Sequence, residues 1–175
     1  MKLLIVYSTK NGTTETCVNH LRSVLKGLDV TTACLEREPS PNLAEYDVVL
    51  VGGSVYFGKF RPALREFLKR NEDALCQKKL GLFFCCGLAH DMEYYMEKLF
   101  SQRLRDAAFQ TLYFGGLLKI EGCGWMDRIL LHSMRSSILE SEIDDGEYTP
   151  TMPSILPENV EKMGTYVREV YRKEK

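Results

Sequence analysis

The fold is decided by the stretch Tyr7-Ser8-Thr9-Lys10-Asn11-Gly12-Thr13-Thr14, which follows an apolar run and precedes a helix-compatible segment. Residues 3–7 are apolar or aromatic and predict a short buried strand, and Gly12 permits a tight turn. Residues 13–15 open a helix whose first N–H groups point back at the loop and attract anions. The stretch therefore predicts a phosphate-binding loop between a first strand and a first helix.

Four hydroxyl groups flank this loop, on Ser8, Thr9, Thr13 and Thr14, and Lys10 adds one cation. Such a set can hold a phosphate monoester mainly through neutral donors. The stretch contains neither Gly-x-Gly-x-x-Gly nor Gly-x-x-x-x-Gly-Lys-Ser/Thr, which excludes the dinucleotide and nucleoside-triphosphate loops. The alternative interpretation is an ordinary polar turn between a strand and a helix.

The composition is that of one soluble globular domain over residues 1–175, with 45% hydrophobic and 27% charged residues and a formal net charge of -1. We expect no nucleic-acid partner, because the sequence has no strongly basic face. The N-terminal residues lack the pattern of a secretory signal, so we expect a cytoplasmic protein. Six cysteines without a Cys-x-x-Cys pair argue against a metal site and for reduced thiols.

Predicted strands and helices alternate along the chain. Apolar runs predict further strands over residues 30–35, 48–53, 80–86 and 109–115, and helical spacing predicts helices from residue 13 and over residues 62–71, 91–105 and 157–172. This alternation predicts an α/β sandwich with a five-stranded parallel sheet in the order 2-1-3-4-5. Ligands of such sheets lie at the carboxyl ends of the strands where the order reverses, here the first, third and fourth.

Two more loops follow strands at that edge. The first offers aromatic rings that can stack on a flat heterocycle, and a glycine that lets the backbone approach it. Its candidate ligand-binding residues are Ser54, Val55, Tyr56, Phe57, Gly58 and Lys59, and those of the second loop are Cys86, Gly87, Leu88 and His90. With Ser8, Thr9, Lys10, Asn11, Gly12, Thr13 and Thr14 they make up the predicted site. The alternative for the rings is that they only cover the edge of the sheet.

These motifs resemble the flavodoxin-like proteins, and among them the menaquinone-dependent protoporphyrinogen IX dehydrogenase branch. The resemblance rests on Ser-x-x-x-Gly-x-Thr after the first strand, on residues 53–58, and on Gly116, Leu117, Trp125, Asp127 and Arg128 after the fifth strand. It implies a flavodoxin-like three-layer sandwich with FMN as cofactor, its phosphate held by residues 8–14. Tyr56 and Phe57 would bracket the flavin ring, with Gly58 beside its reactive edge.

The resemblance implies a flavoprotein whose redox chemistry resides on the flavin, so no catalytic side chain is predicted. The function is then electron transfer or an oxidoreductase reaction, with a redox partner protein or a quinone as partner. Quinone-linked protoporphyrinogen IX dehydrogenation is the narrower alternative. A phosphate-ligand binding module without redox chemistry is the alternative from another class.

An insertion is predicted after the fifth strand, over residues 118–155. We expect Trp125 and Arg128, on a helix over residues 124–138, to contact the substrate or partner. Peripheral contact with the inner face of a membrane, a lid over the flavin and a homodimer contact all stay open for this helix. The acidic run over residues 140–147 departs from the dehydrogenase branch, and would repel porphyrin propionates if it faced the site.

Overall fold

The computed structural model describes residues 1–56, 58–87, 92–116 and 154–173. Parallel strands lie at its centre in the hydrogen-bonded order β2-β1-β3-β5-β6. Their bounds are β1 Lys2–Ser8, β2 Asp29–Cys34, β3 Val48–Tyr56, β5 Lys79–Cys85 and β6 Ala108–Tyr113. Counted along the chain as parallel strands, this order is 2-1-3-4-5, so the predicted topology is confirmed.

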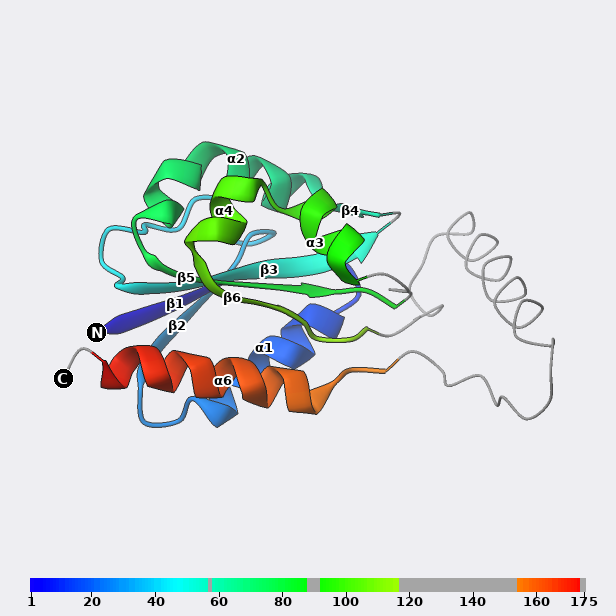
Figure 1. Cartoon of the computed structure of the whole chain (residues 1–175). Helices are drawn as coiled ribbons and strands as arrows, with labels where there is room; N and C mark the ends of the chain where they lie inside the picture. Colours follow the sequence, from blue (N-terminus) through cyan, green and yellow to red (C-terminus); the bar gives the residue numbers. More distant parts are fainter. Residues whose placement is uncertain (57, 88–91, 117–153, 174–175) are drawn as a thin grey trace.

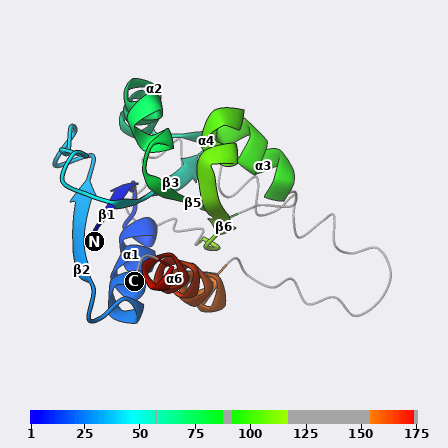
Figure 2. The same cartoon turned by 60° about the vertical axis from the view of Figure 1, so that its left-hand side comes forward.

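Helices cover both faces of the sheet, as Figure 1 shows from the side and Figure 2 after a turn. On one face lie α1 (Thr13–Val24) and α6 (Pro157–Arg172). On the other lie α2 (Pro62–Cys76), α3 (Met92–Leu99) and α4 (Gln102–Ala107). The predicted three-layer sandwich is therefore confirmed.

The strands feed two separate cores because successive side chains of a strand point to opposite faces. Leu4 and Val6 of β1 pack in the core under α2 and α4, whereas Leu3 and Ile5 pack in the core under α1 and α6. All four side chains are at most 1% exposed. Burying a side chain of this size stabilises the fold by about 1.5–3 kcal/mol, so each face of β1 anchors one helix layer.

Several boundaries differ from the sequence-based predictions, and the larger differences are the following. The strand expected over residues 48–53 continues to Tyr56, because its end pairs antiparallel with the unpredicted β4 (Lys59–Phe60). The helix expected over residues 91–105 is two helices, because Ser101 accepts a hydrogen bond from the Leu104 N–H and starts α4. The helix α2 runs on past residue 71 to bury Leu75. The helix α1, which the sequence predicts to close at Gly27, ends earlier, at Val24.

The carboxyl ends of three strands meet at one edge of the sheet. Ser8 at the end of β1 is the register partner of Gly53 in β3, and Ser54 is the partner of Cys85 at the end of β5. The three predicted ligand loops therefore start from adjacent backbone positions. In the part of the chain that the structure describes, no helix is both long and apolar enough to cross a membrane.

Candidate functional site

The loop after β1 turns sharply before α1 begins. Gly12 has a φ of 78°, a left-handed conformation that glycine adopts without strain. Its N–H donates to Thr9 Oγ1 at 3.1 Å, and its carbonyl accepts from the Thr16 N–H at 2.9 Å. The first N–H groups of α1 have no partner within the helix, so they stay available to an anion.

Thr14 contributes a buried hydroxyl for which the described part of the chain supplies no full hydrogen bond. The residue is 0% exposed, and no described residue offers its Oγ1 a hydrogen bond of normal geometry. The hydrogen bond to Cys17 and burial raise the pKa of the Cys85 thiol. The Thr14 hydroxyl contacts the same thiol and lowers its pKa, but by less. Sulfur is a weak acceptor, so this contact does not replace a hydrogen bond to oxygen. A buried polar group without a partner is what a ligand oxygen would complete.

Glu36, two residues after the end of β2, reaches into the same loop. Its carboxylate accepts from Ser8 Oγ at 2.8 Å, from the Thr9 N–H at 3.2 Å and from Arg61 Nε at 2.8 Å. Burial raises the pKa of Glu36, but these hydrogen bonds together lower it below its ordinary value. The carboxylate is therefore ionised at neutral pH. Glu36 is not among the site residues predicted from the sequence, because the segment after β2 has only the composition of a polar connector.

Arg37, the next residue, binds the first turn of α1. Its Nη2 donates to Glu15 Oε1 at 2.7 Å, and the Tyr7 hydroxyl donates to the same oxygen at 3.1 Å. The hydrogen bond from Arg37 is the main cause that lowers the pKa of Glu15. The segment after β2 therefore binds the loop through Glu36 and the first turn of α1 through Arg37.

The loop after β3 is a hairpin closed by β4. Tyr56 pairs with Lys59 across the turn, and Gly58 at the turn has a φ of 69°. The Ser54 hydroxyl is buried, and none of the described residues gives it a hydrogen-bond partner. Phe57, the other predicted ring, lies outside the described residues. The hairpin therefore places the Ser54 hydroxyl, the Tyr56 ring and Gly58 at the same edge of the sheet.

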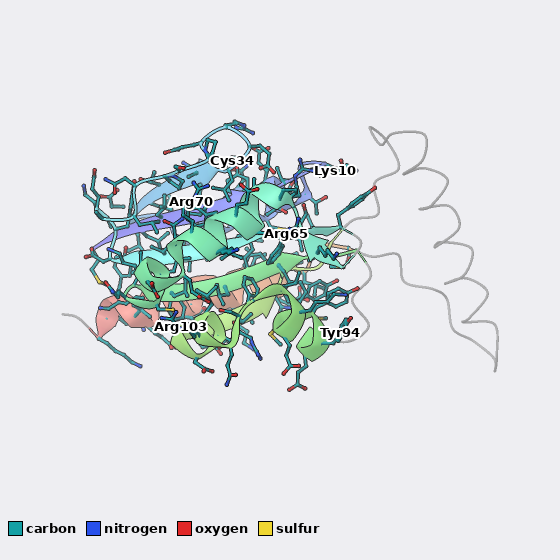
Figure 3. The ribbon with its side chains drawn as sticks, turned by 90° about the horizontal axis from the view of Figure 1, so that it is seen from above. Lys10, Cys34, Arg65, Arg70, Tyr94 and Arg103 are labelled. Atoms are coloured by element: carbon teal, nitrogen blue, oxygen red, sulfur yellow. The ribbon has the colours of Figure 1, made fainter. Side chains whose placement is uncertain are left out.

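Two lysines lie against this hairpin. Lys10 Nζ is 3.8 Å from the centre of the Tyr56 ring, a cation–π contact. Lys98 Nζ from α3 would lie 3.0 Å from a Cβ placed on Gly58, and it donates to the Tyr94 hydroxyl at 3.0 Å. Figure 3 shows Lys10 and Tyr94 at the same end of the molecule. Among the described residues, two lysines therefore lie beside the hairpin that is predicted to bind the flavin ring.

The loop after β5 is held by backbone contacts. The Cys86 N–H donates to the Gly115 carbonyl at 3.0 Å, and the Cys86 carbonyl accepts from the Tyr113 hydroxyl at 2.7 Å. Gly116 passes so close that a Cβ there would lie 2.4 Å from the Cys86 carbonyl carbon. Cys86 and Gly87 keep their predicted places beside the strand end, whereas Leu88 and His90 lie outside the described residues.

A family model described as a flavodoxin domain matches residues 4–142. The chain belongs to the flavodoxin domain family. Flavodoxin domains bind FMN, so the predicted cofactor is confirmed. The predicted resemblance to the flavodoxin-like proteins and their fold is confirmed with it.

Several relatives of this flavodoxin domain are known. It is 25% identical over 180 residues to the protoporphyrinogen IX dehydrogenase [quinone] of Escherichia coli strain K12, covering 97% of this chain and 94% of the relative. Oxidised flavodoxin 2 from Bacillus cereus superposes with a TM-score of 0.55 at 21% identity, over 81% of this chain and 99% of that one. Flavodoxin 1 of the same organism gives 0.52 at 17% identity, over 80% and 98%. These two structures support the fold alone.

The described residues of the flavodoxin domain fit the phosphate of FMN. The Thr14 hydroxyl and the first N–H groups of α1 supply unsatisfied donors, and Gly12 lets the loop turn around an anion. Ser8 and Thr9 add donors that Glu36 occupies here. When bound, FMN supplies the redox chemistry, while the protein sets its position and its electrostatic surroundings.

The remaining predicted contacts are outside what the structure describes. Trp125 and Arg128 both lie in the segment over residues 117–153. Among the described residues, no group of three or more His, Cys, Asp or Glu side chains is placed to hold a metal ion. The site built from described residues is therefore a loop suited to an anion, beside the hairpin that is predicted to bind the flavin ring.

Proposed function

We propose that this flavodoxin domain is an FMN-dependent oxidoreductase that passes electron pairs to a quinone. The observation that carries the proposal is the pair of lysines at the hairpin, Lys10 against Tyr56 and Lys98 against Gly58. A two-electron-reduced flavin holds negative charge on its ring, which nearby cations stabilise. Such a site favours complete reduction at a moderate potential. A quinone, which takes two electrons and two protons, is a matching acceptor.

The overall charge supports the same choice. The formal net charge is -1, so long-range attraction to a basic partner protein is weak. A one-electron shuttle that meets several soluble proteins gains its encounter rate from such attraction. Electron transfer between soluble partners is therefore the less favoured form of the flavodoxin activity here.

Protoporphyrinogen IX is the second candidate, as the electron donor. It is supported by the name of the Escherichia coli relative, which aligns over nearly the whole length of both chains. The residues that would meet a porphyrin belong to the segment over residues 117–153, outside the described structure. We propose the quinone-linked oxidoreductase as the general function and protoporphyrinogen as one donor to test.

We further propose a cytoplasmic location with transient contact at the inner face of the membrane, because quinones dissolve in the bilayer. The helix predicted over residues 124–138 would make that contact. Co-sedimentation with vesicles containing anionic lipid tests the contact directly. A protein that stays in the supernatant at low salt contradicts it.

The visible spectrum of the protein purified after addition of FMN is the first test. We expect flavin absorbance, and a colourless protein that takes up no FMN overturns the proposal. The FMN-loaded protein is then reduced without oxygen and mixed with quinones or with iron–sulfur proteins. Faster reoxidation by quinones is expected. Reoxidation only by iron–sulfur proteins would assign the shuttle function instead.

The variant Lys98→Met tests whether a nearby lysine raises the potential of the flavin. Losing one nearby cation is expected to destabilise the reduced flavin and so to lower the potential of the two-electron couple. Lys26→Met, on the exposed turn after α1, is the matched control and should leave the potential unchanged. Equal potentials in the wild type and Lys98→Met would show that Lys98 does not stabilise the reduced flavin.

A further inference from the structure

The Glu36 carboxylate occupies donors that a flavin phosphate also needs. Ser8 Oγ donates to Glu36 Oε1 at 2.8 Å, and the Thr9 N–H donates to Oε2 at 3.2 Å. Both donors belong to the phosphate loop, and Ser8 is 0% exposed. Two oxygens of one carboxylate thus bind two successive residues of the loop, as two oxygens of a phosphate would.

The two anions cannot share these donors. A serine hydroxyl and a backbone N–H each have one hydrogen to donate. Two negative groups within a few ångströms of each other also repel strongly where water is partly excluded, and the Glu36 side chain is only 26% exposed. Binding of a phosphate at Ser8 and Thr9 therefore requires the carboxylate to move away.

We propose that Glu36 stands in for the FMN phosphate and sets how strongly the domain prefers FMN to riboflavin, which has no phosphate. FMN has to displace the carboxylate from the loop, whereas riboflavin leaves it in place. The inference rests on the proposed FMN-dependent function and adds a residue that determines cofactor specificity. Glu36 lowers the affinity for FMN while keeping the loop ordered before FMN binds.

Arg61 is the residue that receives the displaced carboxylate. Its Nε already donates to Glu36 Oε1 at 2.8 Å, from the position directly before α2. The Arg61 side chain is 32% exposed, so the pair has room to turn together away from Ser8. Arg61 keeps the negative charge of Glu36 neutralised beside the phosphate. Without Arg61, the unpaired negative charge of the displaced carboxylate would repel the FMN phosphate more strongly.

The test compares the affinities for FMN and for riboflavin in purified variants, by quenching of flavin fluorescence. Glu36→Gln keeps the shape of the side chain and removes its charge. We expect FMN to bind about tenfold more tightly, as for a gain of about 1.4 kcal/mol, with riboflavin unchanged. Glu38→Gln is the matched control, because it removes an exposed charge two residues away. It should leave the ratio of the two affinities as in the wild type.

Arg61→Gln gives the opposite expectation. FMN should bind more weakly, riboflavin should not change, and Glu36→Gln added to Arg61→Gln should restore the FMN affinity. Such non-additivity is the signature of two groups that act through each other. Additive effects of the two substitutions would overturn the role of Arg61.

A measurement on the wild-type protein does not depend on how the variants fold. The amide proton of Thr9, observed by NMR, should shift on addition of FMN and stay in place on addition of riboflavin. Equal shifts with both flavins, or weaker FMN binding by Glu36→Gln, contradict the inference and make Glu36 part of the cradle. Failure of every form to bind any flavin contradicts the proposed function instead.

Discussion

The hydroxyl of Thr14 is buried beside the thiol of Cys85, where α1 begins and β5 ends. The sulfur of Cys85 is in turn 3.8 Å from that of Cys17, inside the core under α1. The hydroxyl therefore lies between an apolar core and the phosphate loop. Without a ligand it costs stability, because a buried polar group has lost water and gained no full hydrogen bond.

Thr14→Val separates the role of this hydroxyl in binding from its cost in folding. We expect FMN to bind more weakly by about 1.5–3 kcal/mol, the range for a lost hydrogen bond to a charged group. The protein without FMN should become more stable, because a methyl group replaces an unsatisfied hydroxyl of the same size. Fluorescence titration and urea unfolding measure the two effects. Thr16→Val is the control, because the exposed Thr16 hydroxyl donates to the Gly12 carbonyl and not to the phosphate. An unchanged FMN affinity in Thr14→Val would place the phosphate elsewhere.

Tyr56→Ala tests whether the hairpin binds the flavin ring. Stacking and the contact with Lys10 should both be lost, so we expect weaker FMN binding by about 1 kcal/mol or more and a changed potential. Tyr46→Ala, before the start of β3, removes a ring at the other end of that strand. It should affect stability and not the bound flavin. If both variants bind FMN equally well, the aromatic hairpin only covers the sheet.

The hydroxyl of Tyr113 makes the free energy of unfolding depend on pH in the alkaline range. Burial is the main cause that raises its pKa from 10.0 to about 12. The unfolded chain therefore loses the tyrosine proton at lower pH than the folded chain does. Stability from this group is complete below pH 10 and decreases as the pH rises toward about 12.

The variant Tyr113→Phe should be less stable than the wild type at neutral pH but should lose less stability at alkaline pH. At neutral pH it should be less stable by about 1 kcal/mol, since the hydrogen bond to the Cys86 carbonyl is lost. Its stability should decrease less than that of the wild type as the pH passes 10. Urea unfolding at several pH values measures this, with the exposed Tyr94 changed to Phe as control. Parallel pH profiles of the wild type and Tyr113→Phe would rule out this role.

Removing residues 122–149 behind a short Gly-Ser linker tests what decides the reaction partner. The backbone around this segment is already closed, because Gly116 N–H donates to the Ser154 carbonyl and Leu156 N–H to the Phe114 carbonyl, both at 3.0 Å. We expect retained folding and FMN binding, with loss of electron transfer to the quinone. Circular dichroism, FMN titration and quinone reduction are the three measurements. A deletion variant that cannot bind FMN would show that the segment is structural.

Local patterns in the sequence were sufficient for the strand order and for α6, whose bounds, Pro157–Arg172, are as predicted. A proline at its first position and a regular apolar stripe are local signals. Glu36 could not be found in this way. Its hydrogen bond to Ser8 joins residues 28 positions apart, and a glutamate in a polar connector looks solvent-exposed. The break before α4 was missed for a similar reason, since Phe100 turns into the core to meet the Phe60 ring at 5.1 Å.

The antiparallel bridge between Gly115 and Ile155 brings the two ends of residues 117–153 together on the folded core. For a chain segment anchored at neighbouring points, doubling the number of residues costs only about 0.6 kcal/mol of closure entropy. A change in the length of the chain between these two residues therefore adds little closure entropy to the folding of the FMN-binding core. Selection can lengthen or shorten that part of the gene at a small cost in closure entropy.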